Sequence, residues 1–149
     1  MIACIKNFFV SQKIEPLSHT LVKREFRMQL GERMRKDCIV ILSDPYYTPI
    51  SESHINEIYE RAGLRNKKYI PDLFDCDNYA MAMAVSVAEH ARRSRKTRYQ
   101  YAFGVVYGDI PTPHAINWFI TPEGKVMFME PQSGEIFHPK GNNIVFLYT

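Results

Sequence analysis

Apolar residues in the first half of the chain recur mainly at the spacing of an α-helix. Between residues 18 and 36 they are interleaved with basic residues, a pattern typical of a moderately amphipathic helix, although Gly31 weakens its second half. Residues 51 to 62 show the same periodicity more clearly, with serines that can cap the start and Gly63 suited to a left-handed stop. The first half therefore predicts two surface helices.

A third helix is expected from Asp75 or Cys76 to about Arg93, in a run rich in alanine and methionine that lacks proline and glycine. The run is apolar nearly all round in its middle, so it should be the buried central helix of the fold. Basic residues gather at its C-terminal end, where positive charge complements the helix dipole. We prefer this explanation to a nucleic-acid contact for Arg92, Arg93, Arg95, Lys96 and Arg98.

The second half of the chain is dominated by β-strand patterns. A β-branched run at residues 38 to 42 already predicts one buried strand, closed by a turn signal at Ser43, Asp44 and Pro45. After Tyr99, aromatic and β-branched runs cover residues 101–108, 114–120, 125–130 and 143–149. Helices followed by an antiparallel sheet predict an α+β fold. The length, with no linker or repeat, predicts one domain over residues 1–149.

Composition narrows the class of protein without indicating a function. Apolar residues make up 46% and charged residues 23%, close to the averages of globular proteins, which disfavours disorder and membrane residence. Residues 1 to 12 are apolar but lack the features of a cleaved signal, and we expect them to be part of the fold. The formal net charge of +3 is too small to indicate a nucleic-acid partner.

The three cysteines, Cys4, Cys38 and Cys76, are widely spaced, which predicts neither a disulfide framework nor a zinc site. Free thiols favour a reducing, cytoplasmic location. Cys76 stands where the third helix begins, and the positive end of a helix dipole lowers the pKa of a thiol placed there. It is therefore the candidate nucleophile, and a buried structural thiol is the alternative.

A predicted hairpin brings His114 and Glu130 together. Its turn fits a three-residue loop with Gly124 in the left-handed position. In the register that pairs Thr121 with Lys125, His114 and Glu130 share one face as diagonal neighbours. The carboxylate could then orient the imidazole for a thiol, as in a catalytic triad. A strand-edge histidine and a solvated carboxylate are the alternatives.

Three motifs, DCDNYA from residue 75, HAINWFI from residue 114 and MEPQSGEI from residue 129, carry a family resemblance. Their order and spacing resemble the papain-like cysteine protease domain at the C-terminus of the Marasmius oreades agglutinin and its small phage and bacterial relatives. The resemblance covers about residues 43 to 137. It implies a papain-like fold, a Cys-His-Glu triad at Cys76, His114 and Glu130, and a divalent cation, calcium first, near the acidic residues.

Two features of that family have no counterpart in this sequence. No glutamine shortly precedes Cys76, so the expected side-chain donor of an oxyanion hole is missing. The sugar-binding module of the agglutinin is also without a counterpart, and lectin activity is not expected.

The leading prediction is a cysteine hydrolase of amide, peptide or isopeptide bonds, with Cys76 as nucleophile, His114 as general base and Glu130 orienting it. Transglutaminase-like acyl transfer stays open. Asp77 and Gln132 are expected to support the triad or a hard cation, although the chemistry needs no cofactor. The expected partner is a protein or peptide substrate. Binding to a membrane or to nucleic acid is not expected, and formation of a homodimer stays open. The alternative is an inactive binding or inhibitor protein on the same scaffold.

Overall fold

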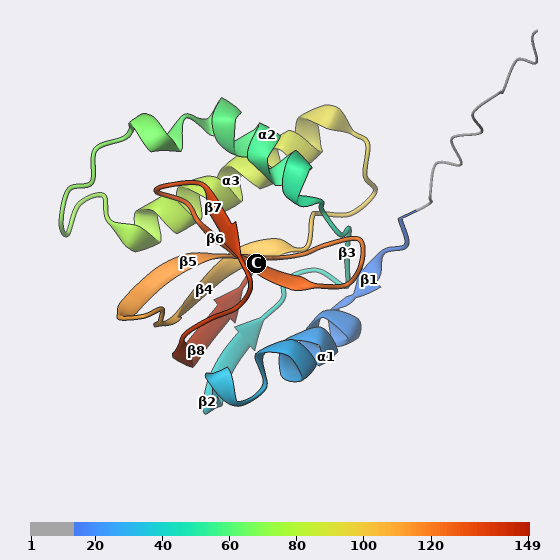
Figure 1. The fold of residues 1–149 in the computed structure, drawn as a ribbon. Helices are drawn as coiled ribbons and strands as arrows, with labels where there is room; N and C mark the ends of the chain where they lie inside the picture. Colours follow the sequence, from blue (N-terminus) through green and yellow to red (C-terminus); the bar gives the residue numbers. More distant parts are fainter. Residues whose placement is uncertain (1–13) are drawn as a thin grey trace, which may run out of the picture.

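The computed structural model describes residues 14–149, which form a six-stranded sheet with helices on both faces (Figure 1). This is the mixed helix and sheet architecture that the sequence predicts. The expectations for residues 1 to 12 and for Cys4 lie outside the described residues. Along residues 14–149, no helix is both long enough and apolar enough to cross a membrane.

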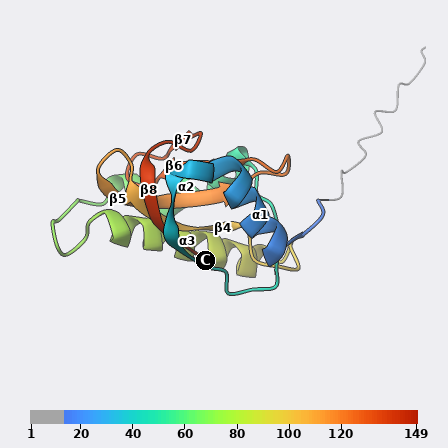
Figure 2. The ribbon, with the colours of Figure 1, turned by 90° about the horizontal axis from the view of Figure 1, so that it is seen from below.

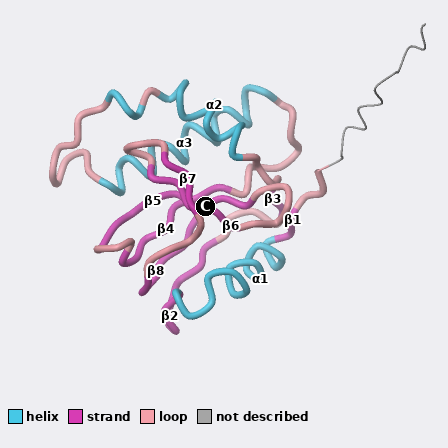
Figure 3. Tube along the Cα trace, viewed as in Figure 1, coloured by secondary structure: helices cyan, strands magenta, loops and turns pink. Residues whose placement is uncertain are grey.

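Figure 3 shows how helices and strands follow one another along the chain. The helices are α1 (His19–Leu30), α2 (Glu52–Ala62) and α3 (Cys76–Ser94), with 3-10 turns η1 (Gly31–Arg33) and η2 (Leu64–Asn66). The strands are β1 (Leu17–Ser18), β2 (Met34–Ile41), β3 (Tyr46–Tyr47), β4 (Phe103–Asp109), β5 (Pro113–Ile120), β6 (Val126–Glu130), β7 (Glu135–Phe137) and β8 (Asn142–Tyr148). The main sheet has the order β2-β8-β4-β5-β6-β7, and β1 pairs with β3 separately.

Different helices cover the two faces of the main sheet (Figure 2). On one face, α1 packs Phe26 edge-on against Trp118 of β5, with ring centroids 4.7 Å apart. On the other face, α2 and α3 form a second core in which Met83 and Phe119 are buried. Because apolar side chains fill both faces, the central strands are held firmly and the positions of their ends are fixed.

The helix α3 begins at Cys76, as the sequence predicts. The side chain of Asn78 accepts a hydrogen bond from the backbone N–H of Asp75 at 3.2 Å, the reciprocal half of a capping box. At the other end, Arg92 pairs with Glu89 at 2.9 Å, one helical turn away. This ion pair supports the assignment of the basic residues to the helix end.

The hairpin between β5 and β6 has the predicted register. Asn117 pairs with Met129, and the backbone N–H of Thr121 donates to the carbonyl of Lys125 at 2.9 Å. Gly124 takes the left-handed conformation that the loop requires, with φ of 80°. The turn chemistry alone was therefore sufficient to align these two strands.

The first and last parts of the sheet differ from the prediction. Residues 38 to 41 of the predicted buried strand belong instead to the edge strand β2, where Ile39 and Ile41 are 57% and 48% exposed. The pairing of β2 with β8 is parallel, so the sheet is not wholly antiparallel. The short strand β7 was not predicted, because three residues are too few to show a periodicity.

The first helix is shorter than predicted. It ends at Leu30, because Gly31 adopts φ of 50° and starts the 3-10 turn η1 that leads into β2. Glycine is the residue that takes this backbone conformation without steric cost. The apolar residue Met34, which fits the helical pattern, instead begins a strand.

Candidate functional site

His114 and Glu130 form a hydrogen-bonded pair at neighbouring strand ends. Nε2 of His114 lies 2.7 Å from Oε2 of Glu130, and each side chain is 21% exposed. The other carboxylate oxygen accepts from the backbone N–H of Gln132 at 3.0 Å, and the carbonyl of Gln132 accepts from the hydroxyl of Tyr59. Gln132 thus touches the pair through its backbone. These contacts do not test the roles predicted for His114, Glu130 and Gln132, which stay predictions.

Cys76 lies half-buried in the first turn of α3, beside the small apolar cluster of Ala80, Val105 and Ala115. Ala115 directly follows His114 in β5, so the thiol lies near this end of the strand. Within residues 14–149, the side chain of His114 bonds to the carboxylate only, and no hydrogen bond joins it to the thiol. The structure therefore brings two of the three predicted triad residues into contact.

Asp77, the other predicted supporting residue, belongs to an acidic group at the start of α3. Ligand atoms of Asp75, Cys76 and Asp77 lie within 4.8 Å of one another. Hydrogen bonding to the Asp77 carboxylate raises the pKa of the Asp75 carboxyl, because Asp75 must keep its proton to donate it. Asp77 does not contact the pair of His114 and Glu130.

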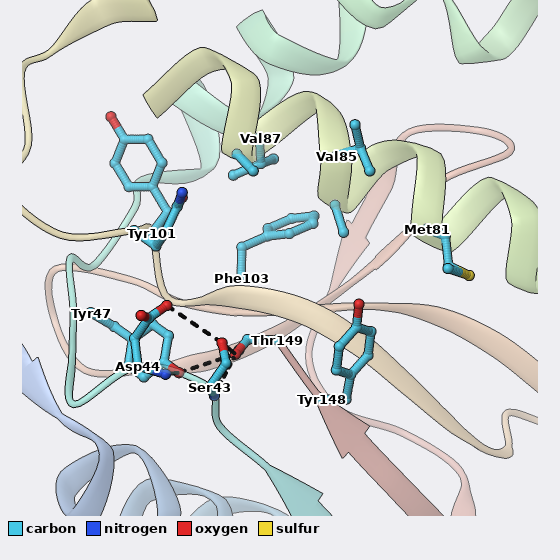
Figure 4. Close-up of a pocket in the computed structure, with 13 residues that line it drawn as sticks. Ser43, Asp44, Tyr47, Met81, Val85, Val87, Tyr101, Phe103, Tyr148 and Thr149 are labelled. Atoms are coloured by element: carbon cyan, nitrogen blue, oxygen red, sulfur yellow. Dashed lines mark hydrogen bonds between the residues drawn. The ribbon is translucent and has the colours of Figure 1, made fainter. Parts of the chain in front are cut away.

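A separate cavity of about 290 Å³ opens between α3 and the adjoining ends of β4 and β8 (Figure 4). We call it the α3 pocket. Its lining residues come from β3 and the turn before it, from α3, from the start of β4 and the segment that precedes it, and from the end of the chain at β8. They are Ser43, Asp44, Tyr47, Met81, Ala84, Val85, Val87, Ala88, Gln100, Tyr101, Phe103, Tyr148 and Thr149.

Polar groups on one side of the α3 pocket are fixed by hydrogen bonds (Figure 4). The hydroxyl of Tyr47 accepts from the backbone N–H of Asp44 at 2.8 Å and lies 3.0 Å from Oγ1 of Thr149. The backbone N–H of Ser43 also donates to Oγ1 of Thr149, at 3.3 Å. The half-buried carboxylate of Asp44 lies at this polar edge and accepts a hydrogen bond from the Ser43 hydroxyl at 3.4 Å, which leaves acceptor capacity to spare.

The opposite side of the α3 pocket is apolar. Met81 and Val85, one turn apart on α3, are 50% and 61% exposed, which is unusual for such side chains on a helix that packs on a sheet. Phe103 forms part of the wall and is buried. Tyr148 is half-buried, and its ring stacks on that of Phe146 with centroids 5.9 Å apart. The pocket therefore offers ring faces beside fixed polar groups.

None of the residues of the α3 pocket was predicted as a functional residue. They come from segments far apart in the sequence, and neither helical nor strand periodicity reports which distant segments meet. Two local signals were present: aromatic residues at Tyr101 and Phe103 with strand spacing, and the exposed apolar positions Met81 and Val85 on a helix. Each signal alone is also typical of a core residue.

Comparison with known proteins gives a family match and two similar solved structures. A family model described as Agglutinin C-terminal matches residues 47–136. A structure described as the PSL1a-E64 complex is 22% identical with a TM-score of 0.78, over 90% of this chain and 51% of that chain. The Polyporus squamosus lectin bound to the human-type influenza-binding epitope Neu5Aca2-6Galb1-4GlcNAc is 23% identical with a TM-score of 0.73, over 90% and 49%. No curated protein matches. The chain spans about half the length of these solved structures.

These findings correct the predicted function. A cysteine hydrolase or acyl transferase acting on a protein or peptide substrate is the wrong prediction, because the matched family is an agglutinin domain and a similar structure is a lectin bound to a glycan. The alternative from the sequence, an inactive binding or inhibitor protein on the same scaffold, fits better.

Proposed function

Because the chain belongs to the Agglutinin C-terminal family, we propose that it is a binding protein that holds a carbohydrate without changing it chemically. The observation that carries this proposal is the α3 pocket, where aromatic and aliphatic side chains lie beside hydroxyl, amide and carboxylate groups. The glycan in the Polyporus squamosus structure is a ligand of that lectin. It supports a sugar as the class of ligand to test here.

The lining of the α3 pocket matches the two surfaces of a sugar ring. A pyranose has faces of C–H groups and a rim of hydroxyls, so its site needs an apolar platform and polar groups at the edge. Tyr148, Met81 and Val85 supply the platform, while Asp44 and Gln100 supply an acceptor and a bifunctional amide. The volume of about 290 Å³ is at the lower end of ligand pockets, which favours one terminal sugar unit over a long segment of polymer.

Glycan-array binding of the purified chain tests this proposal. We expect retention on at least one class of glycan, with displacement by the free sugar. Asp44→Asn should weaken that binding by about tenfold, since losing one charge-assisted hydrogen bond costs roughly 1.4 kcal/mol. Glu123→Gln, an exposed change in the hairpin turn, should leave it unchanged. Absence of retention on any glycan, with the chain folded, would refute the proposal.

We further propose that a divalent cation, calcium first, binds at the start of α3. The donor atoms of Asp75 and Asp77 lie close enough to share one ion, and carboxylate oxygens are the ligands that calcium prefers. The nearby thiol of Cys76 is a soft ligand and would add little. A bound cation would neutralise the two adjacent carboxylates and brace the first turn of the helix.

Thermal unfolding with and without calcium tests this site. Calcium should raise the melting temperature of the wild type by a few degrees, and chelator should reverse the change. Asp77→Asn should remove the response, whereas Glu135→Gln, an exposed change elsewhere, should keep it. A response that is the same in Asp77→Asn, or no response in the wild type, would exclude calcium from this position.

The finer description of the fold as papain-like is also proposed. It is supported by α3, which starts with a cysteine and packs across the sheet that carries His114 and Glu130.

A reducing, cytoplasmic location likewise stays a proposal. It is supported by Cys38 and Cys76, which are free thiols in the described part of the chain.

A further inference from the structure

Two histidines from different helices meet between α2 and α3. His54 lies in the first part of α2, and His90 lies near the end of α3. Their Nε2 atoms are 2.9 Å apart, and the rings are nearly perpendicular at 83° with centroids 4.8 Å apart. Neither residue was assigned a role by the sequence or takes part in the α3 pocket's lining, and both are half-buried.

Burial and the neighbouring charges favour the neutral form of His54 by lowering its pKa. Burial lowers the pKa of His54, and the neighbouring His90 lowers it further. The negative charge of Glu57 on α2 raises the pKa of His54. The positive charges of Lys96, beyond α3, and of Arg61 on α2 lower it. Neutral imidazole is the form of histidine that binds metal ions.

The hydrogen-bonding state of the rings leaves the Nε2 atoms available. In the present contact one Nε2 must donate a proton to the other. Within residues 14–149, Nδ1 of His54 and Nδ1 of His90 make no hydrogen bond, so each can carry the ring proton instead. Both Nε2 atoms would then offer a lone pair to a metal ion.

The separation of the two nitrogens matches a pair of cis metal ligands. Imidazole nitrogens bind first-row divalent metals at about 2.0–2.1 Å, which places two cis ligands about 2.9 Å apart at a right angle. Right-angled coordination is typical of the square-planar and tetragonal sites of copper(II) and nickel(II). The helices α2 and α3 pack against a shared core, so the ligands are held in place before the ion arrives.

We propose that His54 and His90 form a binding site for a divalent transition metal of the copper and nickel kind, which links α2 to α3. Water would complete the coordination, because both histidines are only half-buried. The rings of His54 and Tyr101 are also nearly perpendicular, with centroids 5.4 Å apart, and Tyr101 lines the α3 pocket. The metal would therefore stiffen one wall of that pocket. The proposal itself is independent of carbohydrate binding and of calcium.

Thermal unfolding of the untagged chain with nickel chloride tests the site. Nickel should raise the melting temperature by several degrees, and EDTA should abolish the change. His54→Gln and His90→Gln should each lose the response, and the double variant should behave like either single one. His138→Gln, which changes an exposed histidine, should keep it.

A second measurement guards against a variant that folds poorly. In a copper(II) titration of the folded wild type, the electron paramagnetic resonance spectrum should show nitrogen ligands at one equivalent, and His90→Asn should lose that spectrum. An unchanged melting temperature with nickel, or a response that persists in both His54→Gln and His90→Gln, would overturn the proposal. A spectrum without nitrogen ligands would overturn it as well.

Discussion

Replacing Gly104 by alanine should destabilise the chain by about 3 kcal/mol, because a side chain at this position has no space. Gly104 lies in β4 opposite Trp118 of β5. A Cβ atom there would overlap the carbonyl oxygen of Tyr148 and lie 2.8 Å from Nε1 of Trp118. The same indole nitrogen donates to that carbonyl at 3.3 Å, so the contact cannot open without losing a hydrogen bond. Urea unfolding followed by circular dichroism measures the loss.

Gly124→Ala is the matched control for Gly104→Ala. Gly124 has φ of 80° in the hairpin turn, but nothing lies within 4 Å of the position of a Cβ. Alanine there should cost only about 1 kcal/mol, from the left-handed backbone conformation. If Gly104→Ala cost no more than Gly124→Ala, the close approach of β4, β5 and β8 described above would be wrong.

Removing the ring of Tyr148 should weaken glycan binding by about 30-fold, equivalent to roughly 2 kcal/mol. In the proposed complex this ring is the aromatic platform under the sugar, and alanine offers no such face. Tyr148→Phe should retain most of the affinity, because the ring is kept. Calorimetric titration with the glycan selected on the array measures both values.

Tyr107→Ala is the control for Tyr148→Ala. Tyr107 is a 40% exposed tyrosine of the same sheet that does not line the α3 pocket. This variant should bind the glycan as the wild type does. Equal affinities for wild type and Tyr148→Ala, with both proteins folded, would remove the α3 pocket from the binding site.

The helices and the central hairpin could be predicted because their signals are local. Ser51 caps α2 with its own side chain and Gly63 ends it in the left-handed conformation, as the sequence indicates. The register of β5 and β6 follows from a turn of a few residues. The position of a strand at the edge of the sheet and its direction could not be predicted, because they depend on which distant strands pair. The parallel contact of β2 with β8 leaves no mark in the sequence of either strand.

The functional site was harder to predict than the fold, for a physical reason. The motif residues His114 and Glu130 do meet, but an imidazole bonded to a carboxylate also serves simply to join two strand ends and a turn. The sequence cannot distinguish these uses. The α3 pocket depends on contacts between α3, the turn at Ser43 and Asp44, and Tyr148. Such contacts arise only when the whole sheet is assembled.

The most direct test of carbohydrate binding in the α3 pocket is an NMR titration of the ¹⁵N-labelled chain with the glycan selected on the array. Binding in the pocket should produce saturable shifts of the backbone amides of Asp44, Val85, Gln100 and Tyr148, with amides on the α1 face unchanged. No saturable shift, or saturable shifts confined to residues outside this pocket, would contradict it. So would cleavage of an added peptide by the wild type that is lost in Cys76→Ala.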